Sequence, residues 1–383
     1  MLVFRYLKSN LSGGVVALYT NRIIQGIAGG LLGLFLPVFL YQQYQSINLL
    51  LIFYFFSFGL YLFLAAPGAI IASKITFKKS LIFSVFGGTL FYVCFYFFES
   101  NILLFSILAL IFVNIDRMLY WVPYHSDFAK FTDKKTRGKT IAVLDSIASL
   151  VSIAIPAIAG FIIVQHGFNV LFLIVIFVYL SSVIPFFIIP RISEQYTFTY
   201  LQTWRMLFHP RDRKILFTYM ADGAESIIGA VIWPIFIWQI LQGDFEAVGI
   251  ISSLIILATI LLRLIIGSYT DRLNKKKLLQ LGSLLYSVGW LIKIFAQTGL
   301  HIFIVSTYHN LSSIAMRTPY DTLMYEKAAD AGHYIDEYTV LREMALNLGR
   351  LLAILVLFIL LNFVGLNYAF IIAAVSILFI NLI

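Results

Sequence analysis

Charged residues are scarce in this sequence. Only 12% of its 383 residues are Asp, Glu, Lys or Arg, whereas 61% are hydrophobic. Soluble domains average about a quarter charged and about half apolar residues. A water-soluble protein of this size cannot bury so much apolar surface. The composition therefore excludes an ordinary soluble protein and indicates that lipid is the solvent.

Cysteine and the common catalytic motifs are also nearly absent. Cys94 is the single cysteine and lies in an apolar run, so neither a disulfide framework nor a Cys-based metal site can form. The sequence has no Gly-x-x-x-x-Gly-Lys loop, which argues against an ATP-driven pump, and no His-Glu-x-x-His or Gly-x-Ser-x-Gly motif. We therefore expect no enzyme, no catalytic residues, no metal and no cofactor.

Long apolar runs with short interruptions fill most of the chain. A helix needs roughly 20 mostly apolar residues to span a bilayer, and the runs predict an all-α integral membrane protein with twelve transmembrane helices. The expected spans are 14–40, 47–73, 80–98, 102–124, 138–164, 168–190, 215–241, 247–270, 277–298, 302–323, 337–362 and 366–383.

The Lys and Arg residues behind the net charge of +9 fall in alternate loops. Short cytoplasmic loops are rich in Lys and Arg, so we expect both termini to face the cytoplasm, in a multi-pass protein of the cytoplasmic (inner) membrane. The basic surplus suits anionic lipid headgroups, and nucleic acid is not expected as a partner. Loops 42–47, 165–167 and 242–246 contain no Lys or Arg. The basic positions in the loops and at the adjoining span ends include Arg5, Lys8, Lys74, Lys78, Lys79, Lys130, Lys134, Lys135, Arg137, Lys139, Arg191, Arg205, Arg211, Arg213, Lys214, Arg272, Lys275, Lys276, Lys277 and Lys327.

The longest loop divides the predicted spans into six and six. We expect an N-terminal six-helix bundle over 1–190, a cytoplasmic linker over 191–214 and a C-terminal six-helix bundle over 215–383. Within the linker, the aromatic and basic segment 204–208 predicts a short interfacial helix.

The two halves repeat one another in short stretches. Pro37 in span 1 matches Pro234 in span 7 at an offset of 197 residues, and Pro123 in span 4 matches Pro319 in span 10 at an offset of 196. The first offset also places Gly26 opposite Gly223. A parallel repeat of six helices is thus expected.

The loop between spans 8 and 9 carries the most specific motif. It reads Gly267-Ser-Tyr-Thr-Asp271-Arg272-Leu-Asn-Lys-Lys-Lys, and a degraded copy follows span 2 over 69–79. This loop resembles the hallmark Gly-x-x-x-Asp-Arg-x-Gly loop of the major facilitator superfamily, although in that family the first-half copy is usually the better preserved.

The resemblance implies a cytoplasmic latch that includes Gly267 and Asp271. In such a latch, glycine permits close helix approach and the basic side chain pairs with a neighbouring carboxylate. The expected pairs are Arg272 with Asp321 and Lys74 with Asp127. The alternative is an ordinary basic loop that only sets topology.

Apart from residues at the span ends, twelve charged residues fall inside the predicted spans, where charge is costly and tends to mark an interior cavity. In the resembling family, spans 1, 4, 7 and 10 line the central path with help from 2, 5, 8 and 11, and this distribution fits all but Lys293. We expect Lys293 to snorkel or to pair locally. The charged positions are Arg22, Asp116, Arg117, Asp145, Asp222, Glu225, Arg263, Lys293, Arg317, Arg342, Glu343 and Arg350.

Asp222 and Glu225 are the leading candidates for ion coupling. They are three residues apart and share a helical face, so they can hold a proton, a sodium ion or a cationic group of a substrate. The alternative is a structural cluster of salt bridges, such as Glu225 with Arg350 or Arg117 with Asp145. Further candidates for the substrate and ion-coupling site are Arg22, Asp116, Arg117, Asp145, Arg350 and His309.

The sequence therefore predicts a monomeric secondary transporter that moves a small molecule by alternating access. A proton or sodium gradient drives it, and the proton is the favoured coupling ion. A mixed-sign cavity favours a polar, zwitterionic or anionic metabolite. The segment 155–160 resembles a motif of proton-coupled drug antiporters and favours an amphipathic compound instead. The alternatives are a non-transporting receptor or assembly protein on the same scaffold, and a lipid-handling membrane protein.

Overall fold

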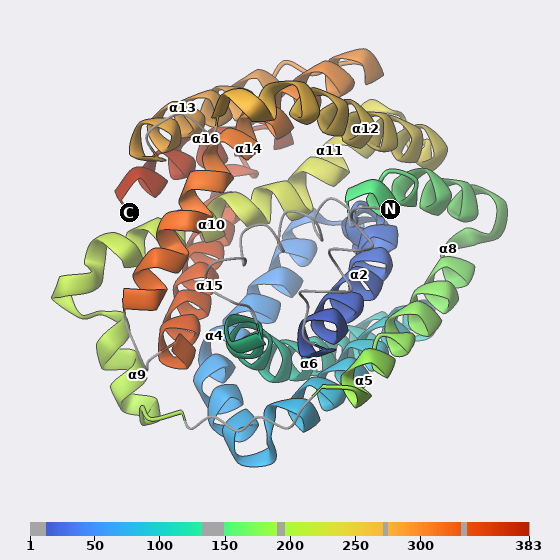
Figure 1. Cartoon of the computed structure of the whole chain (residues 1–383). Helices are drawn as coiled ribbons and strands as arrows, with labels where there is room; N and C mark the ends of the chain where they lie inside the picture. The colour runs from blue at the N-terminus through green and yellow to red at the C-terminus, as the bar shows by residue number, and fades with distance from the viewer. Residues whose placement is uncertain (1–12, 132–148, 190–195, 271–274, 331–334, 383) are drawn as a thin grey trace, which may run out of the picture.

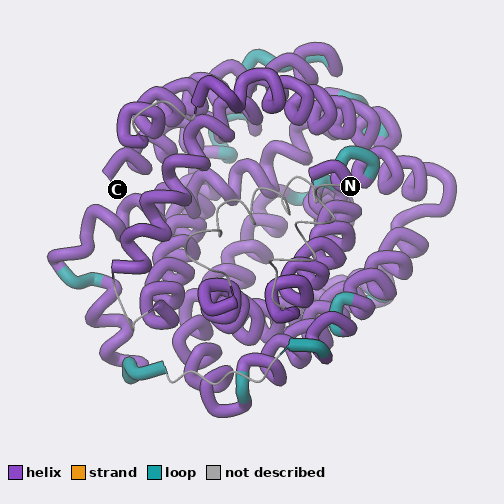
Figure 2. Tube along the Cα trace, in the orientation of Figure 1, coloured by secondary structure: helices purple, strands orange, loops and turns teal. Residues whose placement is uncertain are grey.

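The computed structural model describes residues 13–131, 149–189, 196–270, 275–330 and 335–382 (Figure 1). Every regular element within these ranges is a helix (Figure 2). A chain with long uninterrupted apolar runs favours this outcome, because helices satisfy all backbone hydrogen bonds internally in lipid.

The helices of the first half follow the predicted spans closely. The segment predicted as span 1 is broken into two helices at an angle of 42°. The described end of span 5 and the start of span 6 together form α8. This helix is interrupted at Gly167, whose φ of 78° only glycine adopts readily. The elements are α2 (Gly13–Gly33), α3 (Phe35–Tyr44), α4 (Ile47–Ile75), α5 (Phe77–Tyr96), η1 (Phe98–Ser100), α6 (Ile102–Phe131), α8 (Ile155–Ser181) and η2 (Ile184–Phe187).

The second half begins with a broken span. Its first membrane segment is α10, a π-helical turn and α11, with Pro234 in the first turn of α11. A π-turn inside a helix is often a functional position. The elements are α10 (Arg213–Ile227), η4 (Ile228–Ile232), α11 (Trp233–Ile240), α12 (Phe245–Thr270), α13 (Lys275–Lys293), α14 (Gly299–Asp330), α15 (Ile335–Leu360), η5 (Leu366–Tyr368), α16 (Ala369–Leu378) and η6 (Phe379–Leu382).

The outer surface is apolar, as lipid requires. In the described part of the chain, seven helical segments are long and apolar enough to cross a membrane, and the bent pair α2 and α3 makes an eighth. Large apolar side chains such as Leu103, Phe177 and Ile359 are exposed by 73%, 69% and 64%. A soluble protein rarely exposes this much contiguous apolar surface, so these side chains are expected to face lipid.

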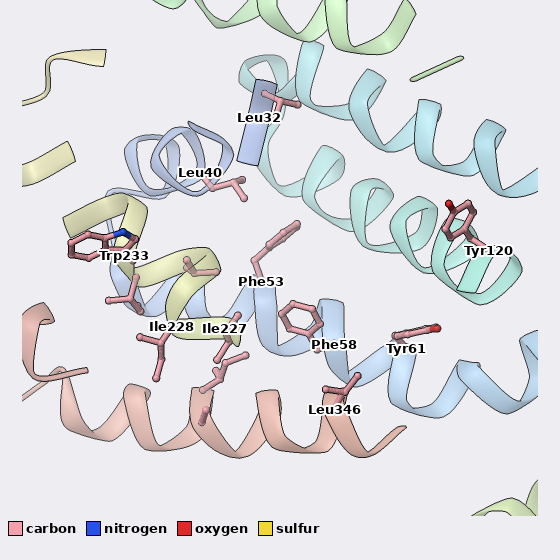
Figure 3. Close-up of a cluster of buried hydrophobic side chains, with 14 of the residues drawn as sticks. Leu32, Leu40, Phe53, Phe58, Tyr61, Tyr120, Ile227, Ile228, Trp233 and Leu346 are labelled. Atoms are coloured by element: carbon pink, nitrogen blue, oxygen red, sulfur yellow. The ribbon is translucent and has the colours of Figure 1, made fainter. Parts of the chain in front are cut away.

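Two helix pairs make the most extensive contacts between the halves. Helix α8 packs against α12, and α4 packs against α15. The first contact is close because Gly160 faces the carbonyl of Phe245 and Gly249 faces the carbonyl of Pro156, where no larger side chain fits. Figure 3 shows the apolar cluster that continues across the second contact, with Phe58 of α4 and Leu346 of α15 both labelled.

The linker contains the helix expected around Trp204. This helix is α9 (Tyr200–Leu207), which begins with a capping box formed by Thr199 and Gln202. It contacts both halves: the Trp204 ring lies 5.4 Å from that of Phe63 on α4, and nearby Thr197 donates from its backbone N–H and its hydroxyl to Glu337 of α15 at 2.8 and 2.6 Å.

Candidate functional site

Asp222 and Glu225 lie together on α10 and pair with the same cation. Arg317 of α14 donates from Nη1 to Asp222 Oδ1 and, at 3.0 Å, from Nη2 to Glu225 Oε2. Both carboxylates are buried, with 5% and 4% exposure. The spacing of three residues places them on one helical face, as expected, and one guanidinium can therefore bridge them.

Two tyrosines complete the hydrogen bonding of the carboxylates. Tyr286 of α13 donates its hydroxyl to Glu225 Oε1 at 2.6 Å, and Tyr320 of α14 donates to Asp222 Oδ2 at 3.3 Å. Every oxygen of the pair thus accepts a hydrogen bond, which offsets much of the cost of burying the charges. We name Asp222, Glu225 and Arg317 with these two tyrosines the acidic cluster.

The pairing of Glu225 with Arg350, named above as part of the structural alternative, does not form, because Glu225 pairs with Arg317. Arg350 instead donates from Nε to Ser226 Oγ and from Nη1 to Asn347 Oδ1, each at 3.1 Å. It points away from Glu225 because its guanidinium lies over the Phe58 ring, 4.8 Å from the ring centre. On the same helix, Arg342 pairs with Glu343 at 3.3 Å.

Arg117 lies over the same aromatic ring as Arg350. Its guanidinium is 4.8 Å from the centre of the Phe58 ring and donates to the carbonyl and hydroxyl of Ser57 at 3.1 and 3.0 Å. The side chain of the neighbouring Asp116 accepts a hydrogen bond from the Tyr179 hydroxyl at 3.0 Å. The two halves thus each bring one arginine to Phe58.

A cavity of about 430 Å³ lies between the halves, next to the acidic cluster. Glu225 and Tyr286 reach it from that cluster, and Lys293, His309 and Trp290 line it further along. We name it the tryptophan cavity. Lys293 does not snorkel, because only 2% of it is exposed; its ammonium lies over the rings of Trp233 and Trp290, 4.2 and 3.9 Å from their centres.

His309 is held by aromatic packing inside this site. Its ring stacks on Tyr286 with centres 4.2 Å apart and meets Trp290 edge-on at 4.6 Å. This packing places His309 on the wall of the tryptophan cavity. The Tyr286 side chain lies between His309 and Glu225. A proton-relay role for His309 stays a prediction.

A second cavity of about 590 Å³ contains Arg22 and Arg263. It shares Ser152 and Ile155 with the tryptophan cavity, so the two volumes adjoin. Arg22 is exposed, and its guanidinium lies 5.3 Å from the centre of the Trp121 ring. The basic side chains line the part of the interface nearer the start of α2.

The predicted latch lies largely outside the described residues. Asp271 and Arg272 are outside them, as is the candidate Asp145. Gly267 and Asp127 belong to α12 and α6, but their surroundings fall outside the described part. Lys74 is exposed at the end of α4, and Asp321 is exposed on α14. Both latch pairs stay predictions.

The sequence did not single out Arg317, Tyr286, Tyr320 or Trp290 as site residues. A signal for part of this set was present: Tyr286, Trp290 and Lys293 follow one another at intervals of four and three, the spacing of one helical face. Among the described residues, no group of three or more His, Cys, Asp or Glu side chains is arranged to hold a metal.

Comparisons with known proteins agree with this architecture. The family model described as Major Facilitator Superfamily matches residues 18–220. A structure titled as a major facilitator superfamily transporter, FucP, in the outward conformation is 13% identical, covering 96% of this chain and 97% of the other with a TM-score of 0.67. A variant of the E. coli fucose:proton symporter FucP is 14% identical, with the same coverage and a TM-score of 0.65. No curated protein sequence matches the chain. At these identities the likeness shows the fold.

Proposed function

The chain belongs to the major facilitator superfamily of secondary transporters, and we propose that it moves a small polar solute by alternating access, with a proton coupled through Asp222 and Glu225. The family membership makes it a multi-pass membrane protein that acts on small molecules within the bilayer. The FucP relatives are titled a transporter and a proton symporter, which supports the same class.

The acidic cluster is the observation that supports proton coupling. Two carboxylates share one guanidinium, so the three charges sum to −1 when all are ionised. One added proton makes the cluster neutral. In a medium of low polarity a neutral cluster costs far less to rearrange than a charged one. The protonation state of the cluster can therefore control the movement of the two halves.

The position of the cavities supports alternating access. The tryptophan cavity and the cavity of Arg22 adjoin between the halves. Beside the loops without Lys or Arg, the halves are in contact: the rings of Tyr41 and Trp238 lie 6.3 Å apart, and those of Phe168 and Phe245 lie 5.3 Å apart. By the distribution of basic loops, the closed side is extracytoplasmic and both termini are cytoplasmic. The proposal places the protein in the inner membrane as a monomer.

The experiment is solute flux in proteoliposomes under an imposed pH gradient. Pooled labelled metabolites, fucose and amphipathic compounds are offered to the protein and to the double variant Asp222→Asn, Glu225→Gln. The matched control is Asp244→Asn, Glu246→Gln, which removes two carboxylates beside a loop outside the cluster. We expect gradient-driven flux that the first double variant loses and the control retains.

Two results contradict the proposal. Flux that follows the pH gradient equally in all three proteins removes Asp222 and Glu225 from coupling. Absence of flux with any proton or sodium gradient, from protein shown to be folded, favours a non-transporting receptor or assembly protein on this scaffold.

A further inference from the structure

The tryptophan cavity contains a buried cation that forms no direct salt bridge within the described residues. In the described part of the chain, Lys293 makes no hydrogen bond or salt bridge with a side chain, and its ammonium lies over the faces of Trp233 and Trp290. Glu225 lines the same cavity but uses both of its oxygens on Tyr286 and Arg317. A buried unpaired ammonium is costly, whereas one facing a bound anion is not.

Three further polar atoms of this cavity also have no partner. Within the described residues, Trp290 Nε1, His309 Nδ1 and Ser306 Oγ are buried and accept or donate no hydrogen bond, and all three residues line the tryptophan cavity. Indole N–H and ammonium only donate. Leaving such a group unsatisfied is unfavourable, so the site favours a ligand rich in acceptor atoms.

The rest of the cavity wall is aromatic or aliphatic. Trp233, Trp290 and Tyr286 present rings from one half, and Ile155 and Pro156 of α8 face them from the other. Flat apolar surfaces opposite aromatic rings suit a planar ligand body. The volume of about 430 Å³ lies in the range of sites for small organic molecules, about 300–1,000 Å³.

We propose that the tryptophan cavity binds a small organic monoanion, whose flat apolar body lies against the rings of Trp233, Trp290 and Tyr286 and whose carboxylate pairs with Lys293. Trp290 Nε1 and Ser306 Oγ then donate to the oxygens of the ligand. This inference rests on the proposed function, because it names the substrate class of that transporter. It selects the anionic, amphipathic class over neutral sugars and over cations.

The test is binding to purified protein in detergent, measured by calorimetry without any gradient. The probes are trans-cinnamate, its neutral isostere cinnamamide, and glucose. In the unchanged protein we expect cinnamate to bind at least tenfold more tightly than cinnamamide, and glucose to bind more weakly than either.

Variants of one side chain locate the preference. Lys293→Met removes the charge and keeps the stem, so the cinnamate-to-cinnamamide ratio should fall to about one, while Lys293→Arg should keep it. Lys277→Met, on the exposed start of the same helix, is the matched control and should leave the ratio unchanged. The ratio in the unchanged protein and in Lys293→Arg remains a test even where Lys293→Met fails to fold.

The proposal is overturned by equal binding of cinnamate and cinnamamide to the unchanged protein, by a ratio that survives Lys293→Met, or by binding of glucose in preference to cinnamate. These outcomes are separate from those of the flux assay. Gradient-driven flux of other solutes, without preferred binding of cinnamate, contradicts only the proposed ligand class. Selective binding of cinnamate without any flux contradicts only the transport function.

Discussion

At the scale of single residues, Arg317 is the side chain on which the acidic cluster depends. It is the cation within 4 Å of both Asp222 and Glu225 in the described structure. Replacing it by methionine keeps most of the volume and leaves two buried carboxylates without a counter-ion. Removing one partner of a buried ion pair typically costs roughly 3–5 kcal/mol.

We therefore expect Arg317→Met to lower the midpoint of thermal unfolding in detergent. Adding Asp222→Asn and Glu225→Gln to the same chain removes the uncompensated charge and should recover most of the loss. Arg211→Met, at an exposed position of the linker, should leave the midpoint unchanged. A triple variant no more stable than Arg317→Met would show that packing, and not charge, explains the effect.

Single residues also show how much of the site could be predicted from the sequence. Asp222 and Glu225 were predictable as a pair because a helix brings positions three apart together. Their partner was not, because Arg317 is 95 and 92 residues away and five other arginines also lie inside the predicted spans. Choosing among them requires the relative rotation of α10 and α14, which apolar runs do not encode.

At the scale of helices, α10 and α15 pack closely through two glycines. A methyl group on Gly223 would meet the carbonyl of Leu346, and one on Gly349 would meet the carbonyl of Met220, both well inside van der Waals contact. Overpacking of this kind costs about 1–3 kcal/mol. We expect Gly223→Ala and Gly349→Ala each to lower thermal stability in detergent.

The sequence repeat supplies the control for this prediction. Gly26 corresponds to Gly223 in the repeat, yet nothing lies within 4 Å of the position of an added methyl group there. Gly26→Ala should therefore leave the unfolding midpoint unchanged. Equal effects of Gly26→Ala and Gly223→Ala would mean that loss of glycine in a helix, and not the α10–α15 contact, explains the change.

Helices were the part most readily predicted, and their interruptions the least. Apolar runs fixed the approximate bounds of α4, α5 and α12, since hydropathy reports directly on burial in lipid. The bend between α2 and α3 and the π-turn at Ile228–Ile232 were missed, because a break of one turn leaves the average hydropathy of a span unchanged.

At the scale of the whole molecule, the two halves contribute different chemistry to the site. The acidic cluster, Lys293 and His309 all belong to the second half, whereas the first half contributes Arg117, Phe58 and the apolar wall of the tryptophan cavity. The family and the six-plus-six pattern were predictable from loops and prolines. The asymmetry of the site was visible only in part, as an excess of charge in spans 7 to 11.

The contact between Tyr41 and Trp238 tests whether the halves move as proposed. Tyr41 lies in α3 and Trp238 in α11, and their rings lie 6.3 Å apart, beside the loops without basic residues. Alternating access requires this contact to open in every cycle. In a Cys94→Ser background, the pair Tyr41→Cys, Trp238→Cys should react with a short cleavable bis-methanethiosulfonate linker, and flux should stop until the linker is reduced.

A matched pair within one half separates locking from simple modification. Tyr44 and Ser106 hydrogen-bond at 2.6 Å inside the first half, so linking Tyr44→Cys to Ser106→Cys joins helices that move together and should leave flux intact. Loss of flux in both linked proteins would point to damage by the reagent. Continued flux through the linked Tyr41→Cys, Trp238→Cys protein would mean that the solute crosses without separation of the halves at this end, and the alternating-access mechanism would have to be abandoned for this chain.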